Sequence, residues 1–103
     1  MASIVQINFP YTESQAEIEN HSEEAAGRFT GVDGLIWKIW LVDEATKTAG
    51  GIYLFSTRDQ AEDYAAGELV NHLKNVRDNV TVSVFDTIDG AGLVTNAPVE
   101  LLH

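Results

Sequence analysis

The sequence contains no cysteine, which excludes a disulfide framework, a thiolate nucleophile and a cysteine-based metal site. No apolar run approaches the ~18 residues that a membrane-spanning helix requires, and the amino-terminal apolar segment is too short for a secretory signal. Basic residues are scarce: six Lys and Arg stand against sixteen Asp and Glu, and the net charge is −10. Such a surface repels nucleic-acid phosphates and anionic lipids. We therefore expect a cytoplasmic protein without nucleic-acid or membrane partners.

The length and composition are those of one globular domain. The chain has 103 residues, of which 45% are hydrophobic and 21% charged, and this is enough for a single core. We expect residues 1–103 to form one domain, with the core in residues 1–89 and a tail in residues 90–103. The tail ends in the apolar residues Val99, Leu101 and Leu102, which we expect to dock against another surface.

Residues 34–55 predict a β-hairpin around which the domain is organised. Two runs rich in β-branched and aromatic residues, Gly34 to Val42 and Ala49 to Phe55, flank a polar turn. The adjacent Gly50 and Gly51 suggest a bulge or a close backbone approach. Alternate residues of a strand point to opposite faces, and both faces of the first run are mostly apolar. An antiparallel strand with one solvated face would alternate apolar and polar residues, so we expect both faces to be covered.

The remaining segments complete a β-α-β-β-α-β order. The expected elements are a strand at Ser3–Phe9, a helix at Ser14–Phe29 capped by Thr12 or Ser14, a helix at about Arg58–Leu73 capped by Ser56-Thr57, and a strand at Val80–Ile88. This order predicts an α+β, ferredoxin-like fold: a four-stranded antiparallel sheet with both helices on one face.

The two predicted helices each present an apolar stripe. On the first helix the residues that share a face are Ile18, His21, Ser22, Ala25 and Phe29. On the second helix the stripe is Ala61, Tyr64, Ala65, Leu69 and Leu73, with Glu68 and His72 on it or beside it. These stripes are the surfaces that we expect to face the sheet.

The sheet face turned away from the helices is expected to carry large apolar side chains. Each strand has one apolar phase and a second phase that mixes polar groups with aromatic rings, namely Gln6, Asn8, Lys38, Trp40, Tyr53, Phe55, Ser83 and Phe85. The sequence leaves open which phase faces the helices. With either choice, so much exposed apolar surface is unusual for a soluble monomer. We therefore predict a homodimer packed sheet to sheet.

Several sequence blocks resemble the YdhR-like family of monooxygenases. They are the blocks Gly34–Trp40 and Ala49–Phe55, with the shorter blocks Leu73–Asn75 and Val84–Asp86. The resemblance extends from the first strand to Asp86. It implies a dimeric α+β barrel and kinship with cofactor-independent quinol and anthrol monooxygenases, which oxidise aromatic substrates with O₂, and hence no cofactor. The same barrel also hosts haem-degrading enzymes, isomerases and binding proteins, because a fold does not fix a function.

Three residues are candidates for catalysis. His21 lies on the inward face of the first helix, and histidine can act as a general base near neutral pH. Lys38 can stabilise a developing phenolate, or its stem can lie along apolar surface while its ammonium reaches solvent or a carboxylate. The phenol of Tyr53 can relay a proton. His21 is also a satisfied core or rim residue in many folds, so both interpretations stand.

Four residues are candidates for binding a substrate. Trp40 and Phe55 would line an apolar pocket, although Trp40 is equally interpretable as a core or interface aromatic. Asn8 would hydrogen-bond a ligand carbonyl or bridge strands. His72 with Glu68, four residues apart, forms either an oriented base or a simple surface pair. No metal site is expected, because the histidines lie on separate elements without His-x-x-His or Glu-x-x-His spacing.

The leading functional hypothesis is the oxidation of an electron-rich quinol-like or anthrol-like aromatic by O₂, without metal or flavin. Two alternatives use the same pocket. One is a non-catalytic dimer that binds a small hydrophobic or aromatic molecule, and the other is an isomerase or lyase that transfers a proton without O₂. All three need an apolar pocket with a few polar groups, so the sequence does not separate them.

Overall fold

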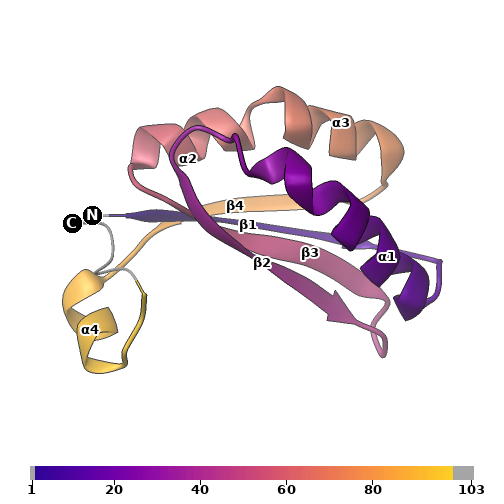
Figure 1. Cartoon of the computed structure of the whole chain (residues 1–103), viewed down its shortest axis with the longest axis horizontal. Helices are drawn as coiled ribbons and strands as arrows, with labels where there is room; N and C mark the ends of the chain where they lie inside the picture. The colour runs from indigo at the N-terminus through magenta and orange to yellow at the C-terminus, as the bar shows by residue number, and fades with distance from the viewer. Residues whose placement is uncertain (1, 99–103) are drawn as a thin grey trace.

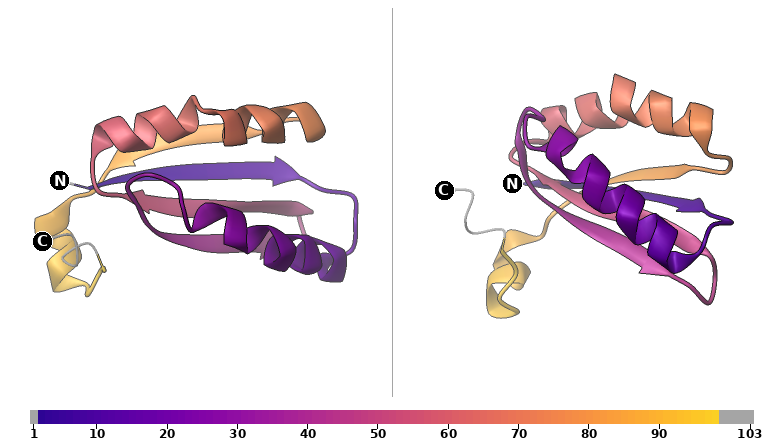
Figure 2. Two further views of the ribbon diagram at one scale, coloured as in Figure 1. Left: turned by 45° about the horizontal axis from the view of Figure 1, so that its top comes forward. Right: turned by 45° about the vertical axis from the view of Figure 1, so that its right-hand side comes forward.

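A computed structural model describes residues 2–98 and shows a four-stranded antiparallel sheet with the strand order β2-β3-β1-β4. The strands are β1 (Ser3–Pro10), β2 (Leu35–Asp43), β3 (Thr48–Phe55) and β4 (Thr81–Asp86). One face is covered by α1 (Gln15–Ala25), the 3₁₀ helix η1 (Ala26–Phe29), α2 (Arg58–Ala65) and α3 (Glu68–Val76) (Figure 1). A further short helix, α4 (Asp89–Val94), lies beyond one end of the sheet, away from these helices (Figure 2). The predicted ferredoxin-like plan is confirmed.

The first helix begins where its sequence predicts. The side chain of Ser14 accepts a hydrogen bond from the Glu17 N–H at 3.2 Å, and the Glu17 carboxylate accepts one from the Ser14 N–H at 3.3 Å. This reciprocal capping box satisfies donors that the first helical turn leaves free. Of the two predicted caps, Ser14 is therefore the one used.

The second predicted helix is two helices, α2 and α3, because Gly67 interrupts it. Gly67 has an extended backbone, with φ −87° and ψ −177°, and it is the N-cap of α3. A side chain at this position would stand 2.9 Å from the Asp63 carbonyl oxygen. The interruption resets the helical phase, so Val70 is buried at 1% exposure whereas Leu69, on the predicted stripe, is 40% exposed.

Strand register decides which residues share a sheet face. Val5 of β1 pairs with Tyr53 of β3 and Val84 of β4, and all three lie in the core beneath the helices. Lys38 pairs with Tyr53 on the same side. The polar residues of β1 and β4 that were grouped with them, Gln6, Asn8 and Ser83, and the ring of Phe85 fall on the opposite face. The prediction that the polar–aromatic phase forms one face is therefore wrong.

A β-bulge between Leu35 and Trp37 explains the change of phase along β2. Leu35 packs against the core under the helices, but Trp37 packs with Leu54 on the opposite face. Without the bulge, Leu35 and Lys38 would point to opposite faces, because they are an odd number of residues apart. The bulge predicted at the two glycines of β3 thus lies in the neighbouring strand instead.

The predicted close backbone approach at the glycines is confirmed. A Cβ atom on Gly50 would stand 1.9 Å from the Ile7 carbonyl oxygen, so this position admits no side chain. A Cβ atom on Gly51 would stand 2.9 Å from Cε of Lys38. The missing side chain of Gly51 therefore leaves room for the lysine stem to cross β3.

The opposite sheet face is only partly covered within residues 2–98. Ala2 and Leu54 are buried there, with Ala97 from the segment after α4 packed against them. In contrast, Ile39 is 50% exposed and Phe85 is 54% exposed. The predicted docking residues Val99, Leu101 and Leu102 lie outside the described residues. None of the helices in the described part of the chain is both long enough and apolar enough to span a bilayer.

Candidate functional site

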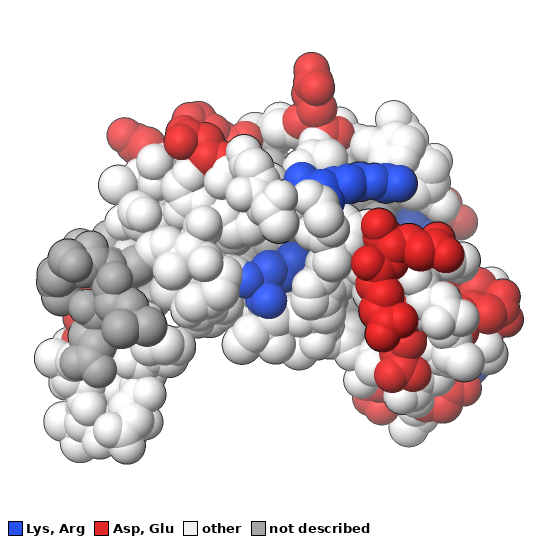
Figure 3. Space-filling view, in the orientation of Figure 1, with Lys and Arg blue, Asp and Glu red and all other residues white. Residues whose placement is uncertain are grey.

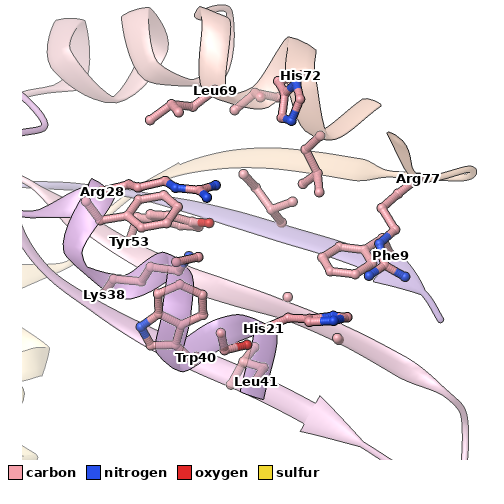
Figure 4. Close-up of a pocket in the computed structure, with 18 of the residues that line it drawn as sticks. Phe9, His21, Arg28, Lys38, Trp40, Leu41, Tyr53, Leu69, His72 and Arg77 are labelled. Atoms are coloured by element: carbon pink, nitrogen blue, oxygen red, sulfur yellow. The ribbon is translucent and has the colours of Figure 1, made fainter. Parts of the chain in front are cut away.

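A cavity of about 370 Å³ lies between the helical layer and the sheet, with walls from α1, η1, α3, β2 and β3 (Figure 4). Helix α1 and η1 contribute Ile18, His21, Ser22, Ala25 and Phe29. This is the face that helical spacing predicts for the first helix. The volume lies in the range of small-molecule sites, and the lining is mostly apolar with a few polar groups, as such sites usually are.

Lys38 is enclosed by aromatic rings at one end of the cavity. Its Nζ lies 3.2 Å from the ring centroid of Trp40, 3.7 Å from that of Phe29 and 4.6 Å from that of Tyr53. Among residues 2–98, no carboxylate lies within 4.0 Å of this ammonium. Burial lowers the pKa of Lys38 to about 7, whereas the ring faces favour the charged form. At neutral pH both the amine and the ammonium forms are therefore accessible.

Two tyrosines form the floor of the cavity beside Lys38. The rings of Tyr53 and Tyr64 lie 5.0 Å apart, and both residues are buried. Burial raises the pKa of both phenols above the ordinary value. The two phenols therefore remain protonated at neutral pH, and Tyr53 can donate a hydrogen bond to an anion in the cavity but cannot act as a base.

An ion pair closes the other end of the cavity. The guanidinium of Arg77 donates two hydrogen bonds to Glu13, at 2.6 and 2.7 Å, and lies 5.1 Å from the ring centroid of Phe9. The hydrogen bonds from Arg77 lower the pKa of Glu13 to about 2. Nδ1 of His21 lies 3.5 Å from Oε2 of the same carboxylate, and the His21 side chain is 56% exposed. Glu13 therefore neutralises Arg77 and also lies beside His21.

Five of the seven predicted site residues line this one cavity. They are His21, Lys38, Trp40, Tyr53 and His72. His72 makes no hydrogen bond or ion pair with Glu68 within residues 2–98, so the predicted pair is not formed there.

The structure does not bring Asn8 and Phe55 to the cavity. Asn8 lies on the other face of the sheet, where its side chain accepts a hydrogen bond from Gln6 at 3.1 Å. Phe55 is fully buried and packs against Tyr64, with the ring centroids 5.3 Å apart. Strand register decides the first placement, and the covering helix α2 decides the second.

Arg28, which is not among the predicted site residues, extends into the cavity from η1 (Figure 4). The sequence does indicate this placement, because Arg28 follows His21 by seven residues and so continues the same helical face. Arg77 was also missed, because nothing in the sequence links the end of α3 to Glu13. Within residues 2–98, no group of three or more His, Asp or Glu side chains is arranged to hold a metal ion.

Comparisons with known proteins agree with this architecture. A protein of unknown function from Nitrosomonas europaea, NE2512, has a similar solved structure, with a TM-score of 0.66, 9% identity, and coverage of 84% of this chain and 89% of that chain. SnoaB, a cofactor-independent oxygenase from Streptomyces nogalater solved in a mutant form, is similar with a TM-score of 0.63, 14% identity, and coverage of 84% and 93%. At such low identities these two structures show the fold alone. No curated protein matches the chain.

The chain also matches a family model over most of its length. The family is described as "Putative mono-oxygenase ydhR", and the match covers residues 4–98. These residues include β2, β3 and β4, all of β1 except Ser3, and every residue that lines the cavity. The protein is therefore a member of the ydhR mono-oxygenase family.

Proposed function

We propose that this protein is an oxygenase that oxidises an electron-rich hydroxyaryl molecule with O₂. The observation that carries the proposal is Lys38, a lysine in an aromatic enclosure with a pKa of about 7. Catalytic proton transfer is most effective when the pKa of the group lies near the working pH. A cavity of about 370 Å³ has room for an aromatic system of about two or three fused rings.

In the proposed reaction, the amine of Lys38 takes the proton of the substrate hydroxyl. The ammonium that forms is held by the ring faces of Phe29 and Trp40, and Tyr53 donates a hydrogen bond to the aryloxide. This electron-rich anion transfers one electron to O₂, and the two radicals combine as a peroxide at a ring carbon that carries hydrogen. The peroxide takes back the proton held by Lys38, and loss of water from that carbon then gives a quinone. One oxygen atom enters the product, the other leaves as water, and the Lys38 amine is restored.

We propose that His21 and His72 contact the substrate from the opposite wall of the cavity. Both line it, and Nδ1 of His21 faces the Glu13 carboxylate at 3.5 Å. This leaves Nε2 of His21 free to hydrogen-bond a second substrate oxygen. His21 therefore orients the substrate, whereas Lys38 carries the proton.

We also propose that the active form is a homodimer packed through the sheet face opposite the helices. Ile39 and Phe85 are half exposed on that face. The indole N–H of Trp37 is buried there without a hydrogen-bond partner within residues 2–98, and buried donors usually have one. A second copy would cover the exposed apolar groups.

The function is tested by recording O₂ consumption with a panel of quinols and anthrols, with and without a chelator. Uptake should exceed autoxidation, and ¹⁸O₂ should label the product quinone with one atom. Lys38→Met should abolish this uptake, because methionine fills the same space but accepts no proton. Lys74→Met removes an exposed lysine that does not line the cavity and should leave the rate unchanged. Trp40→Phe should slow turnover without unfolding the protein, because it keeps a ring beside Lys38.

Each alternative function has its own outcome in this assay. If ligands bind but O₂ uptake never exceeds the background, the protein is a binding module. If product forms equally well without O₂, it is an isomerase or lyase. Full activity of Lys38→Met would refute the assignment of the base.

A further inference from the structure

Basic side chains are concentrated at the cavity of this otherwise acidic protein. Three of the six Lys and Arg residues line it, namely Arg28, Lys38 and Arg77. Among the acidic residues in the described part of the chain, only Glu24 does so. On the face shown in Figure 3, most of the blue atoms lie toward the middle, whereas red atoms lie along the top and the right-hand side. The cavity therefore differs in charge from the rest of the surface.

The three cations at the cavity are not equivalent. Arg77 is neutralised by its bidentate pair with Glu13. Lys38 lies against the aromatic rings and has the proton-transfer role proposed above. Arg28 is exposed and makes no ion pair or hydrogen bond within residues 2–98, although it extends into the cavity (Figure 4). Its charge is therefore available to a ligand.

At this position the guanidinium of Arg28 is suited to binding an anion. It remains charged at any working pH, so it cannot act as the base. Its planar donors match the two oxygens of a carboxylate, and such bidentate pairs are stronger than hydrogen bonds between neutral groups. Aromatic walls such as Phe29 and Trp40 recognise the ring of a ligand but not its charge.

We propose that the substrate is a hydroxyaryl carboxylate, whose carboxylate is bound by Arg28 while its hydroxyl meets Lys38. This inference rests on the proposed function for the identity of the reacting hydroxyl. The substrate would then be held at two points, by Arg28 of η1 and by Lys38 of β2. Glu24, one helical turn before Arg28, opposes the anion and so sets a lower affinity than Arg28 alone would give.

The test compares 6-hydroxy-2-naphthoate with 6-hydroxy-2-naphthamide, which share ring and hydroxyl but differ in charge. Binding is followed by quenching of tryptophan fluorescence, since Trp40 lies in the cavity wall. The naphthoate should bind at least about tenfold more tightly than the amide. Arg28→Gln should remove this preference by weakening naphthoate binding, and should leave amide binding within about twofold.

Two matched variants sharpen the comparison. Glu24→Gln should tighten naphthoate binding by about two- to threefold, because it removes the nearby negative charge. Arg58→Gln removes an arginine that is paired with Glu62 and Asp86 and does not line the cavity, so it should change neither affinity. Amide binding itself reports that each variant retains a folded cavity.

Three outcomes would each overturn the proposal. They are equal affinity for the two probes, no binding of either probe at millimolar concentration, and a preference for the acid that survives Arg28→Gln. The outcome is separate from that of the proposed function. A carboxylate preference without O₂ uptake would refute the oxygenase and keep the carboxylate site. Uptake that is equally fast with the acid and the amide, and that does not change with the acid in Arg28→Gln, would refute the carboxylate site and keep the oxygenase.

Discussion

At the scale of single residues, the environment of Lys38 disfavours the charged form that a lysine usually has. An ammonium that is partly buried without a carboxylate loses part of its hydration, and cation–π contacts return only a fraction of that free energy. Proteins commonly retain such a destabilising group where the activity needs it. The lysine therefore fits an active site better than a structural role.

This imbalance predicts that Lys38→Met stabilises the protein while it abolishes activity. Lys38 has a pKa of about 7 in the folded protein against 10.5 in the unfolded chain. Between these values the unfolded chain holds more protons, so this group lowers stability at pH 7 and the loss disappears as the pH rises to 10.5. Removing it should raise the free energy of unfolding at pH 7 by about 1–3 kcal/mol.

Urea denaturation of wild type and Lys38→Met at pH 7 and at pH 10 measures this effect. The gain should be smaller at pH 10, because this pH lies close to the pKa of the unfolded lysine and most of the destabilisation has by then been lost. A variant that is less stable than wild type at pH 7 would show that the ammonium is well accommodated and would contradict the burial argument.

At the scale of elements, the ion pair of Glu13 and Arg77 joins segments that are far apart in the chain. Glu13 precedes α1 and Arg77 follows α3, 64 residues later. Both side chains are about one-fifth exposed, at 20% and 22%, so solvent screens the pair only partly. The pair therefore ties the start of one cavity wall to the end of the other.

Glu13→Gln should lower the free energy of unfolding at pH 7 by about 1–2 kcal/mol, because it leaves Arg77 without a charged acceptor. The pKa of Glu13 is about 2 in the folded protein against 4.5 in the unfolded chain. Its stabilisation is therefore present above pH 4.5 and is lost as the pH falls toward 2. Thermal denaturation between pH 3 and 7 should show the two proteins converging at the acid end.

Glu19→Gln is the matched control, since it removes the same charge from an exposed site on α1 that forms no ion pair within residues 2–98. It should change stability by less than about 0.5 kcal/mol. If Glu13→Gln behaves like Glu19→Gln, the pair is structurally unimportant.

At the scale of the whole molecule, the helices cover one sheet face, whereas the other retains exposed apolar groups after the segment following α4 has packed on it.

Light scattering during size-exclusion chromatography should give about twice the chain mass of 11.3 kDa. Ile39→Lys should shift the protein toward the monomer, because it places a charge on the predicted interface. Asn20→Lys adds the same charge on exposed α1 and should not. A wild-type monomer at micromolar concentration would refute the proposed dimer.

The sequence by itself determined the order and type of the main elements. Alternation at the hairpin, the capping box at Ser14 and the helical face that includes His21 are local signals, each readable within a few residues. The break at Gly67 was harder to predict, because one glycine costs a helix only about 1 kcal/mol. Its effect depends on the extended backbone that this position adopts.

Only the tertiary structure decided which residues share the cavity. Register places Asn8 on the far face, and the bulge after Leu35 turns Lys38 toward the helices. Gly51, which has no side chain, leaves space for the stem of Lys38. The ion pair of Arg77 with Glu13 joins residues that are 64 positions apart in the sequence. These relations join residues from different strands and helices, and a strand's side chains change face with a shift of one residue. Local pattern carries no information on such a shift, so the identity of the site depended on the assembled sheet.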